Sequence, residues 1–404
     1  MNASDFATRH AALAHATEGL QRSGPDGTTV SVPSIAKLKD IVRAALGDEG
    51  LRRHAVAAFG DTPATDPVQD RTEAGILRRV LGHVYADEPL HPSDAEITGP
   101  LFPMNVTVTS SPDYDMTSPY VVNPTSGVTI INWGTLTMED QTYFAANAAQ
   151  IVLTANQIIR KGSAPAGWAD FNILGATGAT GSQPGQAGPG GGGTAGSGGT
   201  CINSGTAPGD DGGTGDQGNA GVAGSAGGVG GAGLASQPAT ITFSQGIGAG
   251  GASQITIASR SGTGGAGGTG GQGGTGGQGG QGGNGADCSC TGTNGGAGGQ
   301  GGTGGTGGNG GTGGAAPNGN GPIIVYVPSA QISSIVKSAT TVYGGTGGAG
   351  GAAGPGGAGG SGGGSGKHKS GGNGGPTGGA GQGGSQGPQG AGPGQPVQIQ
   401  VQPV

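Results

Sequence analysis

Aromatic residues are scarce in this chain, and their scarcity limits where a conventional hydrophobic core can form. Among 404 residues there are only 2 Trp, 6 Tyr and 6 Phe, whereas 103 residues are Gly. A domain of such length normally fills its interior with large apolar side chains. We therefore expect an ordinary core only in about the first 175 residues and in the short apolar segments that follow them.

Charge is sparse as well, and no long apolar run is present. Charged residues make up 10% of the chain, and the net formal charge is −7 at pH 7. Because phosphate contacts require clustered Lys or Arg, nucleic-acid binding is not expected. No run approaches the roughly 18 apolar residues of a membrane span, so we expect no such span. The first residues also lack the apolar segment of a secretion signal.

Motifs of familiar enzymes are absent too. No Gly-x-Ser-x-Gly elbow occurs in a strand-turn-helix setting. Gly366-Lys367 resembles part of a phosphate-binding loop. That loop requires Gly where this chain has Ser361, and Ser or Thr where it has His368. Matches to Gly-x-Gly-x-x-Gly carry no information in this composition. We therefore expect no enzymatic activity and no cofactor.

Glycine at regular spacing is what the chain has in abundance. Residues 262–285 and 295–314 read Gly-Gly-x, with a break over 286–294. A period of three matches neither a helix nor a strand, whose periods are about 3.6 and 2.0. It is the period of a polyproline-II-type helix, and at about 3.1 Å per residue each segment would be roughly 70 Å long. Two such arms around a short break predict a hairpin of extended helices.

The same hairpin pattern occurs three times, at 175–233, 262–314 and 344–394. Glycine has no Cβ, so such helices can approach closely and bond to one another through their backbones. Apolar segments with strand-like alternation stand between the hairpins and would anchor the ends of the arms. We predict an ordered bundle of six polyglycine-II helices. A flexible or disordered tail, which glycine-rich sequence often forms, is the alternative.

The part before the hairpins contains two further patterns. Apolar residues at helical spacing predict helices over 3–20, 33–46, 48–59 and 76–85. From residue 97 onward the period changes to two, which predicts strands. The predicted fold class is therefore a multi-domain protein. It has a small α-helical N-terminal module at 1–96 for docking or oligomerisation, a small β-domain at 97–174, either solenoid or sandwich, and the polyglycine-II bundle with interspersed strands at 175–404.

Large aromatic side chains are expected to form the core of the β-domain: Trp133, Tyr143, Phe144, Trp168 and Phe171. Five of the six histidines fall in the helical module, at spacings that fit no familiar metal-ligand set: His10, His15, His54, His83 and His91. We expect no metal site there.

All three cysteines lie in predicted hairpin tips. A disulfide from Cys201 to either Cys288 or Cys290 would clamp the far end of the bundle and leave one thiol over. Three free thiols are an alternative, and so is a zinc site made of these cysteines with His368.

Polar and charged residues gather at the tips, where loops on a rigid scaffold commonly carry binding residues. The candidate binding residues are Asn203, Asp210, Asp211, Asp287, Thr291, Asn294, Lys367, His368 and Lys369. In the alternative interpretation, these charges only keep the end of the bundle soluble.

The Gly-Gly-x runs, with tips at 200–211, 286–294 and 367–370, resemble the receptor-binding adhesins at the ends of long tail fibres of T-even-like bacteriophages. The resemblance covers residues 175–394 and is one of pattern. It implies stacked polyglycine-II helices whose tip loops touch a host surface. The arm spacing and the cysteines are also similar to the snow-flea antifreeze type, in which a flat face of short residues binds ice. Mycobacterial glycine-rich surface proteins share the composition, but their Pro-Glu N-terminal domain is absent.

These patterns predict a non-enzymatic surface or fibre-tip protein. Its tip loops would bind a cell-surface receptor or like subunits, and residues 1–174 would form a homo-oligomer. We expect an extracellular location, or one on a virion or cell surface, reached without a Sec-type signal peptide. A self-assembling extracellular filament subunit and an ice-binding protein are the two alternatives.

Overall fold

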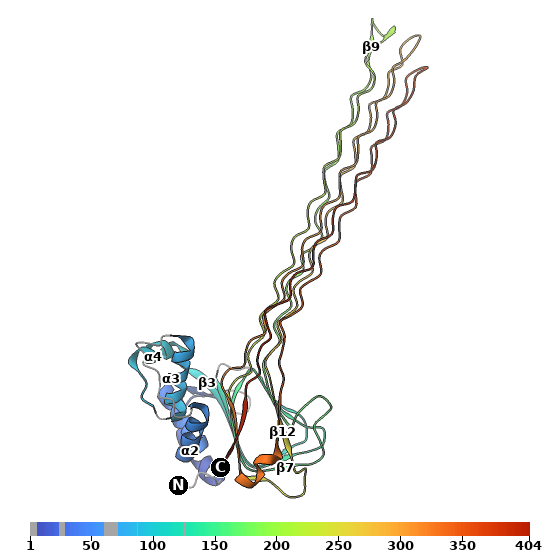
Figure 1. Ribbon diagram of the computed structural model, residues 1–404. Coiled ribbons are helices and arrows are strands. Elements are labelled where there is room, and N and C mark those ends of the chain that lie inside the picture. Colours follow the sequence, from blue (N-terminus) through green and yellow to red (C-terminus); the bar gives the residue numbers. More distant parts are fainter. Residues whose placement is uncertain (1–5, 24–28, 60–71, 87, 124–126) are drawn as a thin grey trace.

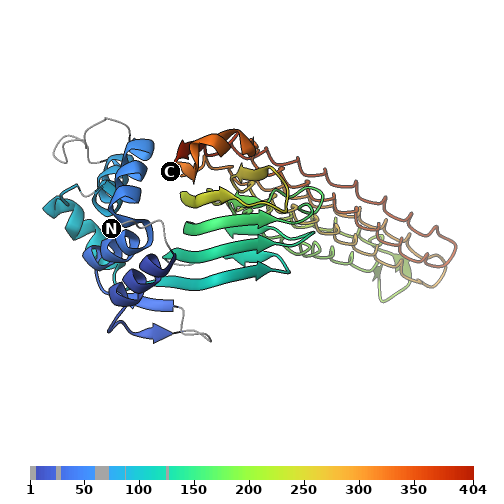
Figure 2. The same cartoon turned by 90° about the horizontal axis from the view of Figure 1, so that it is seen from below.

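Two parallel β-sheets packed face to face form the body of the protein, and a long narrow shaft projects from it (Figure 1). The structure is a computed structural model, which describes residues 6–23, 29–59, 72–86, 88–123 and 127–404. Helices from the N-terminal part lie against one side of the body, away from the shaft (Figure 2).

The larger sheet has eight strands in the order β1-β2-β3-β5-β7-β11-β13-β15. The first two pairings are antiparallel, and all those from β3 to β15 are parallel. The strands are β1 (Arg22–Ser23), β2 (Thr29–Val32), β3 (Met104–Met116), β5 (Val128–Met138), β7 (Gln150–Arg160), β11 (Ala239–Ile247), β13 (Ile323–Val327) and β15 (Ile399–Pro403).

The smaller sheet has five parallel strands in the order β14-β12-β8-β6-β4. They are β4 (Tyr120–Val122), β6 (Phe144–Asn147), β8 (Phe171–Leu174), β12 (Ile255–Arg260) and β14 (Ile335–Ala339). From β3 onward, consecutive body strands alternate between the two sheets, so the chain winds as a flattened coil. A short 3-10 helix, η2 (Ser329–Ser334), lies on the crossing from β13 to β14.

The space between the sheets is the main hydrophobic core. Trp133, Phe144 and Phe171 are fully buried there, as the sequence predicts. Their rings form part of a continuous row of aromatic contacts with centroid distances of 4.4 to 5.7 Å, which ends at Phe243 on β11. Trp168 and Tyr143 do not join this core: 40% of Trp168 is exposed and Tyr143 is only half-buried, so the predicted core position of both is wrong.

The outer face of the larger sheet is covered by helices. Helices α1 (Phe6–Ala16) and α2 (Ile35–Phe59) contact the sheet, and α3 (Glu73–Ala86) packs against α2. Helix α4 (Pro92–Thr98) contacts α3 and is followed by the 3-10 helix η1 (Gly99–Leu101). Apolar residues of α1 and α2, such as Leu13 and Ile41, are buried in one cluster with Val106, Ile130 and Val152 of the sheet. Gly47, the residue between the predicted helices 33–46 and 48–59, has φ 71° inside α2 and marks a kink between two helical parts. The sequence pattern missed α4.

This architecture corrects the predicted fold class. The protein is not a multi-domain chain defined by a polyglycine-II bundle, but an α/β protein built on two parallel sheets. The strands between the hairpins are more than anchors: β11 pairs with β7 and β12 pairs with β8, so they continue the sheets begun within 97–174. Because the buried apolar side chains lie in these shared sheets, the interpretation of the chain as a polyglycine-II fibre is also wrong.

The shaft consists of six glycine-rich segments, here called arms, at 175–199, 212–234, 262–285, 295–314, 344–366 and 371–394. They contain no helix or strand over these ranges, all of which the structure describes. Neighbouring arms are joined by backbone hydrogen bonds that recur every third residue, most of them 2.7–2.9 Å long. The first arm of each hairpin lies in one layer and the second arm in another. Each arm of the middle hairpin bonds to arms of all three hairpins.

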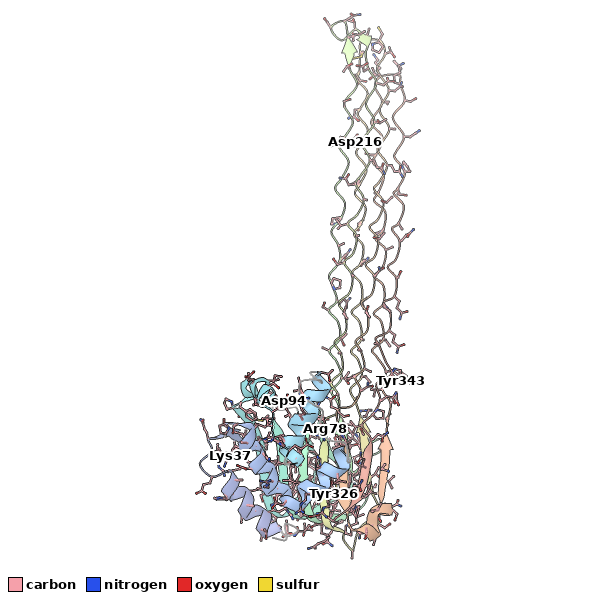
Figure 3. All side chains as sticks on the ribbon, turned by 60° about the vertical axis from the view of Figure 1, so that its left-hand side comes forward. Lys37, Arg78, Asp94, Asp216, Tyr326 and Tyr343 are labelled. Atoms are coloured by element: carbon pink, nitrogen blue, oxygen red, sulfur yellow. A yellow bond between two sulfur atoms is a disulfide. The ribbon has the colours of Figure 1, made fainter. Side chains whose placement is uncertain are left out.

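Glycine in the shaft follows from this close lateral approach. The N–H of Gly274 donates to the carbonyl of Val222 at 2.8 Å, and its own carbonyl accepts from Gly305 at 2.8 Å. A Cβ on Gly274 would overlap the carbonyl oxygen of Gly188. Side chains therefore project outward from the shaft, as Figure 3 shows, while its interior is backbone.

Candidate binding surface at the tips of the shaft

The three tips lie together at the far end of the shaft from the body (Figure 1). The first tip is a small antiparallel hairpin of β9 (Cys201–Ile202) and β10 (Ala207–Pro208). Its turn holds Asn203 at φ 51°, Ser204 at φ 56° and Gly205 at φ 87°. Asn tolerates this left-handed region better than most residues, which suits it to the turn.

A disulfide joins the first and second tips. Cys201 is bonded to Cys288, 87 residues further along the chain, with their Cα atoms 5.9 Å apart. Cys288 is buried, whereas Cys290 is a free thiol and exposed. The sequence predicted a disulfide from Cys201 to either Cys288 or Cys290. The structure has the bond to Cys288, which is the buried one of the two. With Cys288 in this bond, its sulfur is not a thiolate ligand for zinc.

Asn294 connects all three tips. Its backbone N–H and its Nδ2 donate to the Asp211 carboxylate of the first tip at 2.8 and 3.2 Å. Its Oδ1 accepts from the backbone N–H of Ser370 in the third tip at 3.2 Å. The hydrogen bond from the Asn294 backbone lowers the pKa of Asp211, because it stabilises the ionised carboxylate; the Asn294 side chain adds to the effect.

Lys367 ties the third tip to the second. Its Nζ donates to the carbonyl of Ser289 at 3.3 Å, and its carbonyl accepts from the N–H of Gly292 at 2.6 Å. The N–H of Ser289 in turn donates to the carbonyl of Gly205 in the first tip at 3.1 Å. Polar groups thus fix the three loops in one arrangement.

The sequence-predicted residues therefore fall into two groups. Asp211, Asn294 and Lys367 make contacts between tips. Exposed side chains without a hydrogen bond, within the tips as the structure describes them, are those of Asn203, Asp210, Asp287, His368 and Lys369. Thr291 is half-buried and belongs to neither group. These exposed groups are the ones able to meet a partner.

Sequence reasoning missed two tip residues. Ile202 is 53% exposed on β9, an apolar side chain at the outermost end of the molecule. Thr293 is buried, and its Oγ1 accepts from the N–H of Ala286 at 2.8 Å to close the second tip. An isoleucine within a polar loop was the signal for Ile202, because an exposed apolar side chain surrounded by polar residues suggests a contact surface.

Metal ligands do not converge in the described ranges: no group of three or more His, Cys, Asp or Glu side chains is placed to hold an ion. His54 is buried, lies 3.0 Å from the Thr240 hydroxyl through Nδ1 and packs on the ring of Tyr85. No helix in the described parts of the chain is long and apolar enough to cross a bilayer.

Comparison with known proteins gives no relative: no protein-family model, curated protein or solved structure matches this chain.

Proposed function

We propose that this chain is a non-enzymatic binding protein of an extracellular, virion or cell surface, which presents its tip loops to a receptor. The observation that carries the proposal is the arrangement of the tips. Three loops from distant parts of the chain are bonded into one surface at the end of a shaft, and Ile202, His368 and Lys369 remain exposed on it.

The fixed arrangement of the loops favours binding. A loop that is already held in place loses less conformational freedom when a partner binds, so more of the contact energy appears as affinity. Loops on rigid scaffolds are where binding residues concentrate. The tip disulfide also supports an extracellular setting, because such bonds persist in oxidising compartments.

The chemistry of the surface suits a polar partner with some apolar area. Ile202 offers an apolar contact, and Asp287, His368 and Lys369 add exposed polar groups of both signs at the same end of the molecule. Protein interfaces commonly have this composition, with an apolar centre and a polar rim. The resemblance to phage adhesins makes intact bacterial cells the first surface to test.

The test compares two matched double variants of the full chain for adsorption to a panel of intact Gram-negative cells. The tip variant is Ile202→Ser with Lys369→Ala. The control is Val222→Ser with Lys337→Ala, which removes a similarly exposed apolar residue from the shaft and a lysine from the body; Val222 is 55% exposed and Ile202 53%.

We expect the tip variant to adsorb at least about tenfold more weakly and the control to behave like the unchanged protein. Equal adsorption of the two variants would contradict the proposal. So would a failure of the unchanged protein to adsorb to any cells in the panel.

A second candidate function is ice binding, which one face of the shaft favours. Thr177 and Thr263 are exposed on adjacent arms, with their hydroxyls 3.3 Å apart. Thr269 and Thr275 continue the same column at six-residue intervals, with Ala266 and Gln272 at the positions between them. A measurement of thermal hysteresis with the purified protein tests ice binding. If ice melts and grows at the same temperature in the protein solution, ice binding is excluded.

A further inference from the structure

A groove of about 410 Å³ lies on the outer face of the smaller sheet, at the root of the shaft. Its floor is made by β8, β12 and β14, and Trp168 lines one side. This groove is at the opposite end of the shaft from the tips, so it is independent of the proposed function. Its volume is within the range of small-molecule sites, about 300–1,000 Å³.

Trp168 has a position that core packing does not explain. Its ring stacks on Tyr143 with centroids 4.0 Å apart and an angle of 16° between the planes, and 40% of the residue stays exposed. A large aromatic side chain held against a second ring, with free surface toward a groove, provides a flat platform for a ligand.

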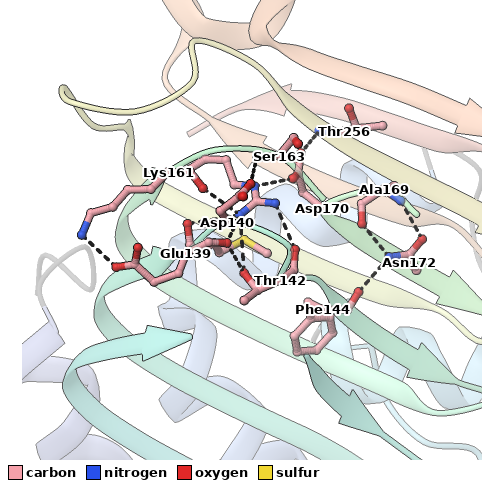
Figure 4. A network of polar contacts seen from close by, with 12 residues as sticks. Glu139, Asp140, Thr142, Phe144, Lys161, Ser163, Ala169, Asp170, Asn172 and Thr256 are labelled. Carbon is pink, nitrogen blue, oxygen red and sulfur yellow. Dashed lines mark hydrogen bonds and ion pairs between the residues drawn. The ribbon is translucent and has the colours of Figure 1, made fainter. Parts of the chain in front are cut away.

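The loop that carries Trp168 is held by a buried polar network, shown in Figure 4. Arg160 is buried and donates through Nε to Asp170 at 2.7 Å and through Nη2 to the carbonyl of Thr142 at 3.0 Å. The other oxygen of Asp170 accepts from the backbone N–H of Thr256 in the groove at 2.8 Å.

Asn172 adds a second anchor beside the tryptophan. Its side chain accepts from the N–H of Ala169 at 3.1 Å and donates to the carbonyl of Ala169 at 2.7 Å. The residues that follow Trp168 are therefore fixed to both neighbouring strands. Asp170 bonds to Thr256 of β12, and Asn172 bonds to the carbonyl of Phe144 in β6. A platform supported in this way meets the usual requirement for a precise binding site.

Polar groups without partners complete the groove. Arg260 ends β12, is exposed, and its guanidinium makes no hydrogen bond or ion pair within the described residues. The hydroxyls of Thr256, Ser338 and Thr340 line the same groove, and none of the three makes a hydrogen bond in the part of the chain that the structure describes. The groove thus combines one aromatic face, one free cation and three free hydroxyls.

We infer that this groove binds a saccharide that carries a carboxylate. A sugar ring has an apolar C–H face, which packs on the face of an indole ring, and a rim of hydroxyls, which pair with Thr and Ser side chains. The planar guanidinium of Arg260 matches a carboxylate by two parallel hydrogen bonds. A phosphate-rich ligand fits less well, because the groove has a single cation among the residues that line it.

Tryptophan fluorescence of the full chain provides the test. Trp133 is fully buried and Trp168 is 40% exposed, so quenching by a small ion reports on Trp168. The probes are trigalacturonate and sialyllactose, with lactose as the neutral comparison and ATP as the phosphate comparison. We expect a saturable change with an acidic sugar, with affinity about tenfold or more above that for lactose.

Variants assign the binding to the groove. Arg260→Ala should remove the preference for acidic over neutral sugar, and Arg260→Lys should restore part of it. Trp168→Ala, followed by isothermal titration calorimetry, should abolish binding of both sugars. Arg52→Ala, which removes an exposed arginine from α2, should change nothing. The inference is overturned if lactose or ATP binds as well as the acidic sugars, if none of the probes binds, or if Arg260→Ala keeps the preference.

Discussion

Asn294 in the second tip donates two hydrogen bonds to the carboxylate of Asp211 in the first tip, from its backbone N–H and from its side chain. This pair connects segments separated by a complete pass down and up the shaft. It is exposed to solvent, so its effect is local order of the tips rather than overall stability.

Asp211 should titrate below its usual pKa of 3.8, because these hydrogen bonds favour its ionised form. A carboxyl group with a depressed pKa favours the folded arrangement, here that of the tips, above its unfolded pKa, and this contribution is lost as the pH falls through the folded value. Carbon-detected NMR titration should show the low pKa, and Asn294→Ala, which removes only the side-chain hydrogen bond and keeps the backbone one, should raise it part of the way to normal. A normal pKa in the unchanged protein would mean that the tips are not joined in this way.

Replacement of Gly274 by alanine should open the shaft locally. The new Cβ would overlap the carbonyl oxygen of Gly188 and press on the N–H of Val222, so neighbouring arms must separate. Overpacking of this kind costs about 1–3 kcal/mol. Gly379→Ala is the matched control, because nothing lies within 4 Å of a Cβ at Gly379. Hydrogen exchange of shaft amides should accelerate in the first variant alone.

Loss of the tip disulfide should destabilise the far end of the shaft. Closure of a loop of 87 residues restricts the unfolded chain, and the chain-entropy model puts the stabilisation at about 4–5 kcal/mol as an upper bound. Cys201→Ser should therefore lower the temperature at which the shaft amides lose protection. Cys290→Ser leaves the bond intact and should have no effect; equal behaviour of both variants would contradict the pairing.

His54 should make stability dependent on pH in the acid range. Burial lowers its pKa to about 4, whereas an unfolded chain has about 6.5. Between these values the unfolded chain binds more protons, so stability is full above about pH 6.5 and declines as the pH falls toward 4, by about 2 kcal/mol at pH 5. Urea unfolding at pH 7 and pH 5 measures this loss, and His54→Gln should remove it. An unchanged loss in that variant would assign the effect to another group.

Helices α1, α2 and α3 could be predicted from the sequence because their signals are local, whereas the short α4 was missed. The apolar spacing around Ile41 and the kink at Gly47 are both visible within a few turns of chain. Sheet pairing is not local: Ala239 lies beside Ile151 only because a complete hairpin returns the chain to the sheet. From the sequence alone, the strands between the hairpins could equally be separate anchors for the arms or a continuation of the sheets begun within 97–174. The fold class was predicted wrongly for this reason.

The candidate site was predictable to a similar degree. Polar residues at breaks in the glycine pattern located the tips, since charged side chains cannot enter the interior of the shaft, which is packed backbone to backbone. Which of them would face solvent depended on bonds between tips, such as that from Lys367 to Ser289, and these appear only when three distant loops meet. Trp168 was misplaced for a related reason, because the loop network of Arg160 and Asp170 holds it outside the core.

The hairpins are inserted between successive turns of the coil of strands that forms the body. The length of the shaft can therefore change without a change in the strand pairings of the body. Three residues added to each arm extend the shaft by about 9 Å, and the contacts between the three tips are kept only when all six arms grow by the same number of triplets. Such coordinated changes would leave every strand pairing in place. Reach is therefore an adjustable dimension of this protein, and related chains with longer or shorter shafts should differ by multiples of eighteen residues, three in each of the six arms.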